Sequence, residues 1–347
     1  MIAKNQRWFF VVTVVMFGII GPFRQSSAEE FYKDKSIGFM VGYSAGGGYD
    51  TFTRAISRHM GQFIPGKPTL IVYNRTGAGS LIAANYVYGR AKADGLTVGV
   101  FGSGLITQQA LGAKGIRFDG RKFGWLGSVS PGTPVCAIMG FTGLKTLDDV
   151  IASKKRLKFG STGAGSTTDD LPRLLNGLMG ANTDIIAGYG GTANLRVAMA
   201  RKELDGACWT WESMRATARA MLEAKGDEQL IPFVIEGKYE DPEVKNTPQF
   251  SDRVKGEDNI RAWKAWINPY KFFRPMVVPP GTPPDRLQTL RVALKKTMED
   301  PAFLAEAKKS KLDVAYTSAE EVERLMQEVL DISPTAKAKL KQLFAAN

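Results

Sequence analysis

The feature that most constrains the fold of this chain is the alternation of short apolar runs with amphipathic helical patterns along almost its whole length. Repeated strand and helix patterns of this kind favour an α/β protein with largely parallel sheets. The segment 236–268 departs from the pattern, because it is polar and carries prolines, and we expect a surface excursion there. The candidate strands are residues 36–43, 68–74, 96–102, 134–141, 156–161, 183–189, 204–209 and 274–279.

Glycine-rich turns follow five of these candidate strands. In parallel sheets such turns gather at the carboxyl ends of the strands, where ligands bind. Helix amino ends at such turns carry unpaired N–H groups and a partial positive charge, which suit a carboxylate or a phosphate. No turn has the lysine of a Walker loop or a complete dinucleotide fingerprint, so we expect no cofactor. The turns are residues 42–50, 74–80, 101–104, 160–170 and 188–194.

Residues 42–46 read Gly-Tyr-Ser-Ala-Gly, which fits the G-x-S-x-G nucleophile elbow of a hydrolase with Ser44 as nucleophile. Such an elbow needs a histidine base, and the sequence has one histidine. His59 follows on the predicted helix after the turn, beside an apolar stripe, where a packed or rim histidine is expected. We therefore expect no enzyme, and keep an exported serine hydrolase using Ser44 as the alternative.

The first 28 residues have the pattern of a signal peptide. Lys4 and Arg7 precede an apolar run, and small residues end at Ala28. We favour cleavage near Ala28 over an uncleaved membrane anchor, and therefore predict an exported, periplasmic protein.

The charge and the cysteines narrow the classes of partner and site. The formal net charge is +12, without a basic block that contains interleaved aromatic residues, so nucleic acid is not an expected partner. Cys136 and Cys208 each lie in an apolar stretch; they could pair in an oxidising compartment, but we favour two buried free thiols. One histidine and two separated cysteines argue against a zinc site, and we predict no metal.

The chain resembles the extracytoplasmic receptors of tripartite tricarboxylate transporters, also called Bug receptors. Two turns carry the most specific part of the resemblance: Gly-Gly-x-Asp at 47–50, and Asn-Arg-x-Gly-Ala-Gly at 74–79, the second followed by Ala-Asp-Gly at 93–95. The segments that resemble this family are residues 40–57, 71–100, 157–175, 186–206 and 279–294.

This resemblance implies a periplasmic-binding-protein-like α/β fold with two lobes joined by two crossing strands and the ligand cleft between them. The first lobe would comprise residues 29–131 plus 268–347, and the second lobe 132–267. The receptor would be a monomer that passes a small carboxylate to a membrane permease, or a sensor of the same fold that passes its closed state to a signalling partner.

The resemblance also implies a set of ligand-binding residues in the glycine turns. Asp50 has a second possible role, a structural one, because an acid near a helix amino end interacts favourably with the helix dipole. Trp209 lies near a position where amino-acid-binding relatives carry an acid, and an indole in its place favours a dicarboxylate or aromatic carboxylate as ligand. Two alternatives remain open: Glu212 could still supply that acid, and Trp209 could be a residue of the apolar core. The implied residues are Tyr43, Ser44, Ala45, Gly46, Gly47, Gly48, Tyr49, Asp50, Ser103, Ser161, Thr162, Ser166, Thr167, Thr168, Tyr189, Gly190 and Trp209.

Overall fold

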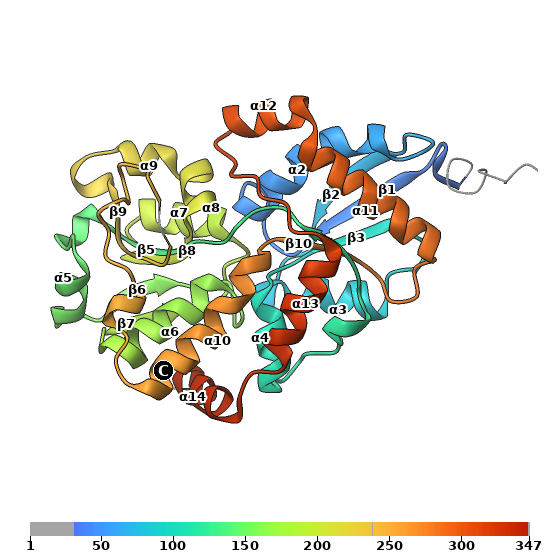
Figure 1. Ribbon diagram of the computed structural model, residues 1–347. Helices are drawn as coiled ribbons and strands as arrows, with labels where there is room; N and C mark the ends of the chain where they lie inside the picture. The colour runs from blue at the N-terminus through green and yellow to red at the C-terminus, as the bar shows by residue number, and fades with distance from the viewer. Residues whose placement is uncertain (1–30, 238, 346–347) are drawn as a thin grey trace, which may run out of the picture.

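The computed structural model describes residues 31–237 and 239–345. The predicted signal peptide lies outside these residues. The described chain forms two α/β lobes, each built around one five-stranded sheet (Figure 1). The predicted fold class is confirmed.

The first sheet has the strand order β2-β1-β3-β10-β4. β1 pairs in parallel with β2 and β3, whereas β10 is antiparallel to both of its neighbours. The strands are β1 (Ser36–Val41), β2 (Thr69–Asn74), β3 (Thr97–Val100), β4 (Gly124–Ser128) and β10 (Pro275–Val278). The helices of the first lobe are α2 (Gly48–Met60), α3 (Leu81–Gly89), α4 (Gly104–Leu111), α11 (Pro284–Glu299), α12 (Pro301–Lys309) and α13 (Ala319–Leu330).

The second sheet repeats this arrangement with the order β7-β6-β8-β5-β9. β6 is parallel to β7 and β8, and β5 is antiparallel to β8 and β9. Its strands are β5 (Pro134–Met139), β6 (Leu157–Gly160), β7 (Thr183–Ile186), β8 (Gly206–Thr210) and β9 (Leu230–Ile235). The helices of the second lobe are α5 (Leu147–Ala152), α6 (Thr167–Met179), α7 (Thr192–Ala200), α8 (Trp211–Thr217), α9 (Arg219–Glu223), α10 (Glu257–Ile267) and α14 (Pro334–Ala345).

The chain crosses between the lobes three times: between β4 and β5, between α10 and β10, and between α13 and α14 (Figure 1). The second crossing contains the short 3₁₀ helix η7 (Asn268–Phe272). The first crossing ends in β5 and the second in β10, and each of these strands lies inside a sheet.

Two helices depart from the predicted organisation. α14 was expected in the first lobe, but Leu340 and Leu343 are buried in the apolar core of the second lobe, where α14 packs on α10 and α6. The segment 236–268 was expected to be an irregular excursion, yet it contains α10 with Trp263 and Trp266 buried on one face. Only Ala262, Trp263 and Trp266 of α10 are buried, so the apolar pattern is too short to show the helical period clearly.

Two strands were not predicted, and both lie at an edge of a sheet. β4 reads Gly-Trp-Leu-Gly-Ser, and glycine is depleted in strands. β9 contains Pro232, which has no N–H to donate and is tolerated at an edge. The pairing with the neighbouring strand, rather than local propensity, decides the conformation of both segments.

Cys136 and Cys208 form a disulfide, so the expectation of two free thiols is wrong. Cys136 lies on β5 directly opposite Cys208 on β8 in the antiparallel register. The two cysteines are far apart in sequence, and only the strand register brings them together. The bridge lies within the second lobe.

Among residues 31–237 and 239–345, no helix combines the length and the hydropathy needed to span a membrane. Over the same residues, no cluster of three or more histidine, cysteine or acidic side chains is arranged to hold a metal ion.

Candidate ligand-binding site

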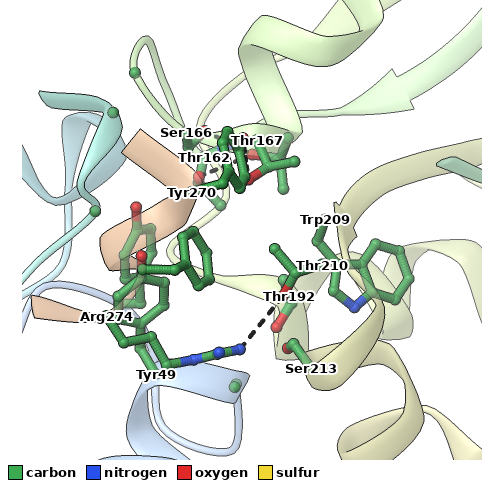
Figure 2. A pocket seen from close by; sticks show the side chains of 18 residues that line it. Tyr49, Thr162, Ser166, Thr167, Thr192, Trp209, Thr210, Ser213, Tyr270 and Arg274 are labelled. Atoms are coloured by element: carbon green, nitrogen blue, oxygen red, sulfur yellow. Dashed lines mark hydrogen bonds between the residues drawn. The ribbon is translucent and has the colours of Figure 1, made fainter. Parts of the chain in front are cut away.

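A pocket lies between the two lobes (Figure 2). Residues of the first lobe, the second lobe and the second crossing line it, namely Tyr43, Gly47, Gly48, Tyr49, Gly102, Gly104, Thr162, Gly165, Ser166, Thr167, Thr168, Thr192, Trp209, Thr210, Ser213, Tyr270, Phe273 and Arg274.

The first glycine turn joins β1 to α2 and is organised by Asp50. The carboxylate of Asp50 accepts hydrogen bonds from the Gly46 amide at 2.9 Å, Arg54 Nε at 3.0 Å and Asn74 Nδ2 at 2.9 Å. Burial raises the pKa of Asp50, but these hydrogen bonds outweigh burial and hold the pKa below its ordinary value. Asp50 itself does not line the pocket, whereas Gly47, Gly48 and Tyr49 do.

The second glycine turn joins β6 to α6 and places a group of hydroxyls in the pocket. Thr168 Oγ1 lies 2.9 Å from Thr162 Oγ1 and 2.8 Å from Ser166 Oγ, and Ser166 Oγ donates to the Gly163 carbonyl at 2.6 Å. Tyr270 Oη donates to Thr167 Oγ1 at 2.8 Å. These hydroxyls are therefore hydrogen-bonded to one another before any ligand arrives.

Two buried acids lie behind these hydroxyls in the first turn of α6. Asp169 accepts from Ser161 Oγ at 2.6 Å and from Arg173 Nε at 2.9 Å. Asp170 accepts from the Gly165 amide at 3.0 Å and from Trp266 Nε1 at 3.2 Å. Burial, and then the charge of Asp169, raise the pKa of Asp170 to about 8, so Asp170 is largely protonated at neutral pH.

Arg274 is the cation of the pocket, and the sequence interpretation did not include it. The residue is 1% exposed and follows η7 in the second crossing. Its Nη1 donates to Ser130 Oγ and its Nη2 to Thr210 Oγ1 at 3.3 Å. Its backbone φ of 54° is uncommon for a residue other than glycine, and such outliers cluster at functional sites.

The guanidinium of Arg274 has no carboxylate within 4 Å among the described residues. Aromatic rings surround it instead, with its Cζ 4.3 Å from the ring centroid of Phe52 and 4.8 Å from that of Phe273. Burial lowers the pKa of Arg274, and the charge of the buried Glu212 opposes this. Arginine nevertheless stays protonated in proteins. A buried cation without an ion pair suits an anionic ligand.

Several buried polar atoms in the pocket lining have no hydrogen-bond partner in the part of the chain that the structure describes. A buried donor without a partner costs free energy, and a ligand or water that satisfies it removes that cost. Of the atoms on pocket-lining residues, these are Arg274 Nε, Ser213 Oγ, Thr192 Oγ1, Tyr49 Oη and Trp209 Nε1.

Some of the residues predicted for the site line the pocket and others do not. The lining residues include Tyr43, whose hydroxyl is directed at the Gly79 carbonyl 3.3 Å away rather than at the pocket. Those in the lining are Tyr43, Gly47, Gly48, Tyr49, Thr162, Ser166, Thr167, Thr168 and Trp209, and those outside it are Ser44, Ala45, Gly46, Asp50, Ser103, Ser161, Tyr189 and Gly190.

The predicted residues outside the lining support the turns. Ser161 holds Asp169 in place, Asp50 holds Gly46, and the Gly190 carbonyl accepts from the Ser44 amide at 3.0 Å. Ser103 is buried at the amino end of α4. The sequence carried one signal for Arg274 that was missed: it is a single charge inside the apolar stretch from Phe272 to Val278.

Ser44 and His59 do not form a nucleophile and base pair. Ser44 Oγ has no hydrogen-bond partner within residues 31–237 and 239–345. His59 lies near the far end of α2, where its Nε2 is 2.8 Å from Glu306 and its Nδ1 is 3.4 Å from Asp300. The Gly-x-Ser-x-Gly pattern forms the first glycine turn, and its Ser44 has no histidine base hydrogen-bonded to it.

The two lobes touch each other through backbone around the pocket. The Gly79 amide of the first lobe donates to the Thr162 carbonyl of the second at 2.6 Å. A Cβ atom on Gly104 would lie 2.3 Å from the Gly165 carbonyl oxygen. The lobes are therefore closed on each other, and glycine at these positions permits the close approach.

Comparisons with known proteins agree with this fold. The family model described as "Tripartite tricarboxylate transporter family receptor" matches residues 264–338. No curated protein sequence matches the chain.

Solved structures of periplasmic binding proteins match nearly the whole chain. The periplasmic binding protein BugD is 19% identical with a TM-score of 0.72, over 90% of this chain and 98% of BugD. MatC from Rhodopseudomonas palustris with bound malate is 19% identical with a TM-score of 0.67, over 89% and 99%. An R. palustris protein with adipate is 16% identical with a TM-score of 0.69, over 90% and 97%. At these identities the likeness shows the fold, and with the family match in the C-terminal segment it confirms the resemblance to the receptor family of the tripartite tricarboxylate transporters.

Proposed function

We propose that this protein is a periplasmic solute-binding protein that captures a small organic carboxylate for uptake by a tripartite tricarboxylate-type transporter. The observation that carries this proposal is Arg274, a buried guanidinium that lines an interlobe pocket without a carboxylate partner among the described side chains. A ligand carboxylate would supply the missing charge and accept hydrogen bonds from the neighbouring unpartnered donors.

The mechanism follows from the position of this site. Arg274 belongs to the second crossing, Gly48 to the first lobe and Ser213 to the second, and a Cβ on Gly48 would lie 2.1 Å from Ser213 Oγ and 3.2 Å from Arg274 Nη2. An anion in the pocket therefore contacts both lobes only when they are closed. Because the ligand gains those contacts only in the closed form, it shifts the population towards closure.

The transporter context rests on the comparisons. Receptors of this family are periplasmic, and two structural neighbours hold malate and adipate. We propose that the closed protein acts as a monomer, without catalysis, and is recognised by the membrane permease. Predicted ligands are dicarboxylates or aromatic carboxylates.

A thermal-shift screen against mono-, di- and tricarboxylates tests the proposal directly. A ligand that binds the native state alone raises the melting temperature, so one chemical group of acids should do so. If no carboxylate shifts the transition or binds in calorimetry, the proposed function is wrong.

Gly47→Asp tests the place of the site. Gly47 is the N-cap of α2 with extended backbone, where aspartate is a favoured residue, so the fold should persist. The new carboxylate adds negative charge to the pocket lining, and binding of an anion should be lost. Gly89→Asp is the matched control, because a side chain at this exposed helix end meets no atom within 4 Å. Undiminished affinity in Gly47→Asp would rule out this site.

A further inference from the structure

The pocket has two polar ends, and they differ in charge. In Figure 2, Arg274, Thr210 and Ser213 lie on one side, and the hydroxyls of Thr162, Ser166 and Thr167 lie on the opposite side. The Arg274 end adjoins the amino end of α2, since Gly48 packs against the guanidinium. A guanidinium and a helix amino end both attract an anion. This end is therefore built for a carboxylate.

The opposite end does not suit a second carboxylate. The amino end of α6 already holds Asp169 and Asp170, both buried, and Arg173 is paired with Asp169. The Gly165 amide is taken by Asp170, and the hydroxyls are bonded among themselves. A ligand anion here would face the charge of Asp169 and a carboxyl that is already hard to ionise. A neutral hydroxyl, which can both donate and accept, fits this end.

Glu212 does not change this assignment. It is fully buried, lies outside the lining, and accepts from the Thr133 amide at 3.2 Å through Oε2. Its charge acts on Arg274 from beyond ion-pair distance and only partly opposes the effect of burial on the pKa of Arg274. Arg274 remains the one cation in the pocket lining of the described chain.

The wall between the two ends is a continuous row of aromatic rings. Tyr49 lies 5.4 Å from the guanidinium of Arg274, and its ring centroid is 5.4 Å from that of Phe273. Phe273 stacks on Tyr270 at 5.4 Å with an interplanar angle of 7°, and Tyr270 reaches the hydroxyl end through Thr167. Tyr43 packs on Tyr49 at 4.5 Å. Flat apolar surfaces of this kind favour a ring over a flexible polar chain.

We infer that the ligand is an aromatic monocarboxylate whose carboxylate binds Arg274 and whose ring lies along Tyr49, Phe273 and Tyr270, with a neutral polar group at the Thr162–Thr168 end. This inference rests on the proposed function and narrows it. It sets the protein apart from its structural neighbours with malate and adipate, which are aliphatic dicarboxylates.

Calorimetric titration of the exported chain with matched acids tests the ligand class. The probes are 4-hydroxybenzoate, benzoate, terephthalate, adipate and hexanoate. Terephthalate differs from 4-hydroxybenzoate at one ring position, where a carboxylate replaces the hydroxyl. We expect 4-hydroxybenzoate to bind most tightly and terephthalate at least about tenfold more weakly, because its second charge is buried without a cation.

Arg274→Gln tests the anchor, with Arg58→Gln as the control that removes an exposed cation paired with Glu306 on the first lobe. We expect Arg274→Gln to weaken binding by roughly 100-fold, because the charge-assisted hydrogen bonds to the ligand carboxylate are lost. Arg58→Gln should leave the affinity unchanged.

Each other outcome decides against the inference. Tighter binding of terephthalate or adipate would overturn the monocarboxylate assignment and leave the proposed function intact. Tighter binding of hexanoate than of benzoate would overturn the aromatic assignment. Full affinity in Arg274→Gln would overturn the anchor, and if that variant fails to fold, the order of the five acids still decides. Binding of none of the acids, and of no other carboxylate, would overturn the proposed function as well.

Discussion

The two glycine turns that meet across the pocket start their helices with different arrangements of acids. In the first turn, one carboxylate, Asp50, binds the Gly46 amide and is paired with Arg54. In the second turn these tasks are divided, because Asp169 is paired with Arg173 while Asp170 binds the Gly165 amide. Gly46 and Gly165 hold equivalent places, with φ values of 74° and 81°.

The two turns therefore differ in how many carboxyl groups of the protein lie at the start of the helix. Asp50 is buried outside the pocket lining, and the amino end of α2 adjoins Arg274 at Gly48. The first turn of α6 instead carries two buried acids, so two carboxyl groups rather than one lie behind this side of the pocket. Two glycine turns with similar sequences therefore give one end for an anion and one for a neutral group.

The substitution Asp170→Asn should produce the largest effect. We expect it to change how the free energy of unfolding depends on pH. The pKa of Asp170 is raised to about 8, so its stabilising contribution is complete below the ordinary aspartate pKa and is lost as pH rises through the raised value. Stability of the wild type relative to Asp170→Asn should fall by about 1 kcal/mol per pH unit from pH 5 to pH 8. Urea unfolding across this range measures it, and parallel profiles for the two proteins would contradict it.

Asp50→Asn should show the opposite pH dependence. The pKa of Asp50 is held below its ordinary value, so its contribution is present above the ordinary pKa and is lost as pH falls through the lowered one. At pH 7 we expect a loss of about 2 kcal/mol, because the three donors lose a charged acceptor and one of its two oxygens is replaced by an N–H₂ group. Asp148→Asn, at an exposed ion pair with Arg253, is the control and should cost about 0.5 kcal/mol. An equal loss in both variants would show that the first turn does not depend on Asp50.

Gly104→Ala tests whether the second turn must approach the first lobe for binding. The added Cβ would overlap the Gly165 carbonyl in the closed form, while the separated lobes would tolerate it. Ligand affinity should fall by about tenfold, which is about 1.4 kcal/mol, with little change in the melting temperature of the unliganded protein. Gly89→Ala, where a Cβ meets no atom within 4 Å, should bind normally. Normal binding by Gly104→Ala would mean that closure does not require this contact.

Ser44→Ala should have the smallest effect. Ser44 Oγ has no hydrogen-bond partner in the described chain, so its removal should change ligand affinity and stability by less than about 0.5 kcal/mol. Calorimetry and urea unfolding measure both quantities. Loss of a measurable esterase activity in this variant would instead support the hydrolase alternative.

Much of the fold could be predicted from the sequence because most strands are apolar runs that follow local propensity. β1, β2, β3 and β6 lie within their predicted segments. β4 and β9 could not be found in this way, since Gly127 and Pro232 lower local strand propensity and pairing in the sheet compensates for it. The packing of α14 on the second lobe depends on a tertiary contact that no local pattern encodes.

The parts of the site that consist of backbone turns could be predicted from the sequence. The parts that depend on side chains from distant segments of the chain could not. Gly47 and Thr167 were found because strand, glycine and helix signals coincide along the chain. Arg274, Ser213 and Thr192 reach the pocket from three separate segments. These three residues come together because the chain crosses between the lobes and the lobes close. The pairing of Cys136 with Cys208 depends in the same way on strand register.

The disulfide has a consequence for the entropy of the unfolded chain. It closes a loop between residues 72 positions apart, which contains β6, α6, β7 and α7 and therefore the whole second turn. Closing a loop of this length removes unfolded-state entropy worth roughly 4 kcal/mol in the simplest treatment. Both ends of the loop lie in one lobe, so the covalent link stabilises the acidic turn without tethering the lobes, and their opening and closing keep their full range.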